Sequence, residues 1–152
     1  MWRLASFTLG VALLLASQSR PALAAAASPL EGVWQVVDVN GQRAAGVYIF
    51  TGTHYSMMFT VGDRPDVDTN KATADELRAV WGPMAANAGV FEINGDQVTI
   101  RPIVAKIPVV MKPGAYEVYA FRIEGNKLFL TQVRNVRGPV EHGNAITLMR
   151  VE

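Results

Sequence analysis

Short runs of alternating apolar and polar residues, separated by glycine-bearing turns, fill most of the chain after residue 30. Alternation with a period of two is typical of β-strands that bury one face. No stretch of the sequence repeats another. The pattern predicts eight strands, at about 31–39, 45–51, 54–61, 89–94, 97–106, 115–124, 127–134 and 144–151.

Three of the connections have the composition of two-residue hairpin turns, around Gly52, Gly95 and Gly125. Such a turn fixes which side chains of the two strands share a face. One face of each predicted hairpin is aromatic or aliphatic, as expected for strands that curl around a shared interior. The three faces hold Tyr48, Phe50, Tyr55, Met57 and Phe59; then Phe91, Ile93, Val98 and Ile100; then Tyr119, Phe121, Ile123, Leu128, Leu130 and Gln132.

The fold class predicted from this pattern is all-β, an antiparallel up-and-down barrel of about eight strands with one inserted α-helix. The opposite faces of the strands are mixed rather than polar. A helix, a second sheet or a second copy of the chain in a homo-oligomer could cover their apolar members, which are Val47, Ile49, Met58 and Val118.

The helix is predicted between the third and fourth strands. Thr73 and Glu76 have the spacing of a capping box, in which each side chain accepts from a backbone amide of the other residue. Leu77, Val80, Trp81 and Met84 follow at the spacing of one helical face, and Pro83 is expected to bend or end the helix. We expect the helix to close one mouth of the barrel or pack on its side, with Trp81 and Met84 in the core.

Residues 1–24 have the layout of a secretory signal peptide. Arg3 precedes the apolar run from Leu4 to Ala16, and Pro21 to Ala24 gives the small-residue pattern of a cleavage site. Polar residues and Pro21 make the apolar run too short for a membrane span. We therefore expect an exported, periplasmic or secreted protein without an integral membrane anchor after cleavage, consisting of one domain, residues 25–152.

The charge balance and the cysteine content limit the classes of partner and of reaction that the sequence predicts. Residues 25–152 are close to neutral, because 13 acidic residues face 14 basic residues of which two lie in the leader. This balance predicts neither nucleic acid nor an anionic membrane as a partner. The sequence has no cysteine, so stability rests on packing without disulfides, and thiolate chemistry is excluded.

Several short motifs resemble, in order, those of the bacterial lipocalin-like domain family, a distant relative of the lipocalins. They include Gly32-Val33-Trp34 on the first strand, 46–51 with 54–57, Arg64-Pro65, 89–96, Ile107-Pro108, 123–128 and the closing Arg150-Val151. The resemblance spans nearly all of residues 25–152. It implies a barrel open at one end that holds a small apolar molecule. It also implies a structural cation-π pair between Trp34 and Arg150 at the closed end.

The predicted interior suits a ligand site more than an enzyme centre. Its polar groups would orient a small apolar or aromatic ligand, although the same side chains could instead fill a narrow barrel. The candidate ligand-binding residues are Tyr48, Phe50, Tyr55, Met57, Phe59, Tyr119 and Gln132.

No catalytic, metal or cofactor site is predicted. The two histidines, His54 and His142, are expected at the surface, and Ser56 is expected to point outward. The loop with Asp66, Asp68 and Asn70 starts like a calcium loop but lacks its turn glycine and bidentate glutamate.

The predicted function is therefore an exported protein that binds a small apolar or aromatic molecule in its barrel. A barrel enzyme of isomerase or cyclase type is one alternative, and it would need an inward ionisable group, which the predicted strand faces do not supply. The other is a structural or interaction domain with a filled barrel, which uses its apolar outer positions.

Overall fold

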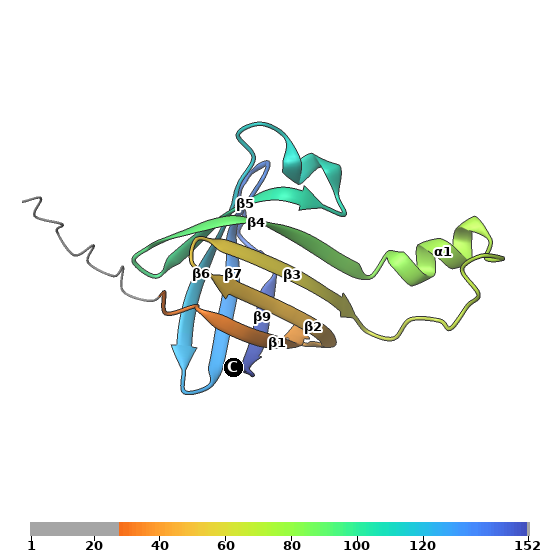
Figure 1. Ribbon diagram of the computed structural model, residues 1–152, viewed down its shortest axis with the longest axis horizontal. Helices are drawn as coiled ribbons and strands as arrows, with labels where there is room; N and C mark the ends of the chain where they lie inside the picture. The colour runs from red at the N-terminus through yellow and green to blue at the C-terminus, as the bar shows by residue number, and fades with distance from the viewer. Residues whose placement is uncertain (1–27, 152) are drawn as a thin grey trace, which may run out of the picture.

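Each strand pairs with antiparallel neighbours until the sheet closes on itself (Figure 1). The computed structural model describes residues 28–151. Its fold is an all-β, lipocalin-like barrel of eight strands with one α-helix in the described part, as the sequence predicts. The barrel strands are β1 (Gly32–Val39), β2 (Gln42–Thr51), β3 (His54–Val61), β4 (Met84–Asn94), β5 (Gln97–Ala105), β6 (Glu117–Glu124), β7 (Lys127–Asn135) and β9 (Ala145–Arg150).

The barrel closes through its first and last strands. Strands β1 to β7 follow one another around the sheet, β1 pairs with β9, and β9 pairs with β7. The two-residue β8 (Gly138–Pro139) pairs with β7 and forms a small extension. Because every long strand has a partner on both sides, the barrel leaves no long free edge.

The three predicted hairpins are confirmed. In each turn the first residue is a glycine with positive φ, at 57° for Gly52, 61° for Gly95 and 60° for Gly125. A positive φ at the first turn position and not at the second is the feature of type II′ hairpins, and glycine adopts it without strain. The resulting registers pair Phe50 with Tyr55, Phe91 with Ile100 and Phe121 with Leu130, so the predicted faces are the faces observed.

One end of the barrel is filled by large apolar side chains. Leu30, Trp34, Phe50, Leu128 and Leu148 are among those that are completely or almost completely buried there. The ring of Phe50 meets that of Phe91 edge to face, with the centroids 5.1 Å apart. Burial of such side chains stabilises a fold by about 1.5–3 kcal/mol each, so this end supplies much of the stability.

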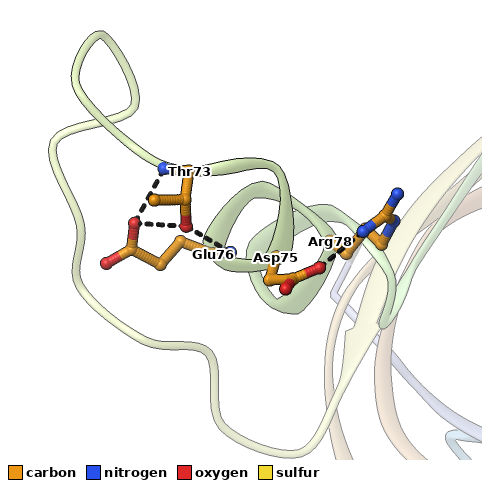
Figure 2. Close-up of polar contacts among 4 residues, drawn as sticks. All are labelled: Thr73, Asp75, Glu76 and Arg78. Carbon is orange, nitrogen blue, oxygen red and sulfur yellow. Dashed lines mark hydrogen bonds and ion pairs between the residues drawn. The ribbon is translucent and has the colours of Figure 1, made fainter.

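The predicted helix is present as α1 (Ala74–Trp81), with Thr73 as its N-cap. Figure 2 shows the capping box, in which the Thr73 hydroxyl accepts from the Glu76 amide at 3.3 Å and a Glu76 carboxylate oxygen accepts from the Thr73 amide at 2.8 Å. The helix ends at Trp81 because Pro83 cannot continue it. Lys106 secures the junction by donating to backbone carbonyls, among them Met84 O at 2.8 Å.

The prediction that α1 closes the barrel or packs on its side is wrong. The helix projects away from the barrel wall (Figure 1), none of its residues is buried, and the Trp81 side chain is 49% exposed. Met84 is not on the helix but begins β4, whose first half extends the fourth strand five residues earlier than predicted. The alanine-rich start of β4 has weak β-propensity, yet its pairing with β3 overrides that preference.

The predicted leader, residues 1–24, lies outside the described residues. Among residues 28–151, no helix has the length and apolar character that a membrane crossing requires.

Candidate ligand-binding cavity

A cavity of about 160 Å³ lies at the end of the barrel opposite the filled one. Residues from β2, β3, β4, β5, β6, β7 and β9 line it, together with Ile107 and Val110 from the connection between β5 and β6. That connection contains the short 3-10 helix η1 (Pro108–Met111), which Figure 1 shows at the edge of the barrel. Ile107 and Asn144 are both exposed and both line the cavity, so they mark its rim.

Small residues on β4 and β5 make room for this cavity. Ala85 lies opposite Phe59 across the β3–β4 pair, and Ala105 lies opposite Asn87 across the β4–β5 pair. All four side chains line the cavity. Farther along the same two strands the equivalent inward positions carry Phe91 and Ile100, which pair with each other and are buried.

The structure brings five of the seven predicted ligand-binding residues together on the cavity wall. These are Tyr48, Met57, Phe59, Tyr119 and Gln132. Phe50 and Tyr55 also point inward, but they are packed in the core rather than on the wall. The Tyr48 ring stacks between Phe50, at a centroid distance of 5.9 Å, and Phe59, at 6.2 Å, which connects the filled core to the cavity.

The polar end of the cavity is formed by Glu117, Tyr119 and Gln132. The Gln132 amide Nε2 donates to Glu117 Oε1 at 3.0 Å and to the Tyr119 hydroxyl at 3.3 Å. Glu117 is 9% exposed and Gln132 8% exposed. Glu117 has no ion-pair partner among residues 28–151, where the ion pairs lie elsewhere on the surface.

Burial shifts the acid-base properties of this group. Desolvation raises the pKa of Glu117, and the Gln132 hydrogen bond offsets only part of that rise. Burial also raises the pKa values of Tyr48, Tyr55 and Tyr119, and the nearby Glu117 carboxylate raises each of them further. The cavity therefore holds one buried carboxyl group within electrostatic reach of three phenols that stay neutral at ordinary pH.

Glu117 corrects the prediction that no inward ionisable group lies deeper than tyrosine or glutamine. The signal was present in the sequence, because residues two apart on a strand share a face and Tyr119 was placed inward. The same alternation places Glu117 on that face. It also gives the cavity a chemistry that an apolar lining alone would lack.

The residues expected at the closed end lie together at the filled end of the barrel. Arg150 on β9 is paired with Trp34 on β1, and its guanidinium carbon lies 4.0 Å from the indole centroid. Trp34 Nε1 donates to Leu30 O at 2.7 Å, and Arg150 donates to Glu31 O at 2.8 Å. Trp34 is completely buried and is not among the residues that line the cavity, so its contacts are those of core packing.

The other polar residues considered in the sequence lie outside the cavity. His54, His142 and Ser56 are exposed, as predicted. In the acidic loop Asp68 accepts from the Asn70 amide at 3.0 Å and pairs with Lys71 at 3.5 Å, both local contacts in an exposed segment. In the described part of the chain, no three histidine, aspartate or glutamate side chains gather as a metal site would require.

Three of the four apolar outer positions are exposed in the described chain, whereas Val118 is half-buried. Val47 is 40%, Ile49 39% and Met58 53% exposed, and α1 does not cover them. A shallow groove beside Met58 is lined by Ala86, Ala88 and Val104. The outer wall of β2 to β5 thus carries an exposed apolar patch.

Comparison of the chain with protein-family models, with curated proteins and with solved structures finds no match.

Proposed function

We propose that this protein binds a small, mainly apolar molecule, about the size of one aromatic ring, in the cavity of its barrel. The observation that carries the proposal is the cavity of about 160 Å³ with an aromatic wall and a polar cluster at one side. Drug-sized ligands occupy pockets of about 300–1,000 Å³, which excludes a large ligand without rearrangement. An apolar cavity of about 150 Å³ is known to bind benzene, so a single ring is the matching size.

The resemblance to the bacterial lipocalin-like family and the barrel fold support the same function. We propose that the chain is a distant member of that family and acts after export, to the periplasm or the medium. The N-terminal mass of the protein recovered from its host tests the export step, since cleavage after Ala24 would leave a chain that begins at Ala25.

Ligand binding can be tested with a cavity-filling variant and a matched control. Ala85→Leu adds three carbon atoms to the wall opposite Phe59, whereas Ala45→Leu adds the same atoms at an exposed position of β2. We expect single-ring compounds to raise the melting temperature of the unmodified protein and of Ala45→Leu, but not that of Ala85→Leu. Native mass spectrometry of protein from its own host would identify a resident ligand. Absence of both effects would contradict the proposal.

Glu117 favours a second candidate, an enzyme of isomerase type. A buried carboxyl group with a raised pKa beside a tyrosine is a suitable general acid or base. The test is to incubate the compound recovered from the protein with fresh protein and with Glu117→Gln. Chemical conversion that only the unmodified protein performs would support the enzyme. Unchanged recovery with both proteins would leave binding as the function.

A further inference from the structure

The buried carboxyl group in the cavity lacks a positive partner. Glu117 receives one hydrogen bond, from the neutral amide of Gln132, and forms no ion pair within residues 28–151. Buried charges in proteins are ordinarily paired, because removal from water disfavours an isolated ion. The cavity lies next to this group, so a ligand placed there is positioned to supply the missing charge.

The groups that face Glu117 from each neighbouring element are neutral or acidic. Strands β2, β3 and β6 contribute the phenols of Tyr48, Tyr55 and Tyr119, and β7 contributes Gln132. On β5 the residue opposite Glu117 is Ile100. The nearest arginines in the strand pairing, Arg101 and Arg134, stack instead on the ring of Tyr116, at 5.5 Å and 4.6 Å from its centroid.

The rest of the wall suits a cation on an apolar body. Aromatic ring faces attract ammonium groups, and Tyr48, Phe59 and Tyr119 line the cavity around Glu117. An ammonium group has donors and no acceptor, so it complements a carboxylate and phenol oxygens. An anionic ligand would be repelled by the same carboxylate.

We propose that the cavity is selective for an amine, with a protonated ammonium group bound by Glu117 and a body of about one aromatic ring packed on Tyr48, Met57 and Phe59. This inference rests on the proposed binding function and specifies its ligand class. Binding of the cation favours ionised Glu117, so a carboxyl group that is still protonated releases its proton when the amine binds.

Benzylamine and ethylbenzene test the proposal, because they have the same shape and differ in charge. Affinities are measured by calorimetry with the full mature chain, with Glu117→Gln, and with Glu92→Gln, which makes the same change at an exposed position of β4. We expect benzylamine to bind the unmodified protein and Glu92→Gln at least about tenfold more tightly than ethylbenzene does. Glu117→Gln should lose that preference and retain ethylbenzene binding.

A pH series on the unmodified protein gives a second measurement that needs no variant to fold. Benzylamine affinity should rise with pH as Glu117 ionises. Release of a proton on benzylamine binding can be measured by calorimetry in buffers of different ionisation enthalpy. Ethylbenzene should show neither the pH dependence nor the proton release. Ethylbenzene binding as tight as that of benzylamine, or a flat pH profile for the amine, would overturn the amine inference alone. If neither compound binds, and Ala85→Leu behaves like the unmodified protein with every single-ring compound, both the amine inference and the proposed binding function are contradicted.

Discussion

Arg150 lies across the buried indole of Trp34, with its guanidinium carbon 4.0 Å from the ring centroid. The same guanidinium donates to Glu31 O at 2.8 Å and to Pro29 O at 3.3 Å. Arg150 therefore connects the last strand to the segment that precedes the first strand. Leu30, which is completely buried, lies within that segment and helps to fill this end of the barrel.

Replacement of Arg150 should weaken the filled end of the barrel. Arg150→Ala removes the cation-π contact and both hydrogen bonds, and we expect the free energy of unfolding to fall by about 1–2 kcal/mol, since the group is partly exposed to solvent. Arg150→Lys should recover only part of this loss, because an ammonium group cannot stack as a plane while it spans two carbonyls. Urea unfolding followed by circular dichroism measures both. Arg137→Ala, in an exposed loop, is the control, and equal stability of the two alanine variants would contradict the prediction.

Removal of a hydroxyl from the barrel interior should have opposite effects at two tyrosines. The Tyr55 hydroxyl is buried without a hydrogen-bond partner in the described chain, whereas the Tyr119 hydroxyl accepts from Gln132. Because an unsatisfied buried hydroxyl is destabilising, Tyr55→Phe should leave stability unchanged or raise it by about 1 kcal/mol. Tyr119→Phe should lower it by about 1 kcal/mol. Thermal unfolding of the pair decides the matter, and a loss of stability in Tyr55→Phe as large as in Tyr119→Phe would refute it.

The hairpins and the inward faces could be predicted from the sequence, because they depend on local information. Gly52, Gly95 and Gly125 start tight turns, and each turn fixes the face of the strands beside it. Glu117 could have been predicted by the same alternation from Tyr119. The position of the cavity could not, because it depends on small residues such as Ala85 and Ala105 that meet large ones only after the barrel closes.

The segment from Trp81 to Ala88 shows why local patterns also failed. Helical spacing relates Leu77, Val80, Trp81 and Met84 in the sequence. In the structure Pro83 ends the helix, and Met84 pairs with β3 as part of a strand. Periodicity shows that a helix has an apolar face and does not show what that face contacts. For α1, no residue of the described chain buries it.

The stability of α1 should therefore be local and depend on its cap. A helix of eight residues is marginal in water without tertiary packing. Thr73→Ala removes the capping box, and we expect amide hydrogen exchange in α1 to accelerate about fivefold while the melting temperature of the barrel stays the same. Thr69→Ala, in the exposed loop before the helix, should change neither quantity. A lower melting temperature for Thr73→Ala would show that α1 supports the barrel.

The buried carboxyl group predicts a particular dependence of stability on pH. Desolvation raises the pKa of Glu117 in the folded protein above the ordinary value of 4.5 that it regains on unfolding. Between these two values the folded state holds a proton that the unfolded state has lost, so stability falls as pH rises. The stabilising contribution of protonated Glu117 is complete below pH 4.5 and is lost as pH rises through the folded pKa.

Glu117→Gln should remove this dependence, because its amide stays neutral and its carbonyl oxygen can still accept from Gln132. The variant should gain stability relative to the unmodified protein as pH rises, with a slope of up to about 1.4 kcal/mol per pH unit between the two pKa values. Guanidinium unfolding from pH 4 to pH 8 measures the difference. Glu92→Gln, at an exposed site paired with Arg101, should follow the unmodified protein across this range. Parallel curves for Glu117→Gln and the unmodified protein would mean that Glu117 is hydrated like a surface carboxylate, and the amine site would lose its electrostatic basis.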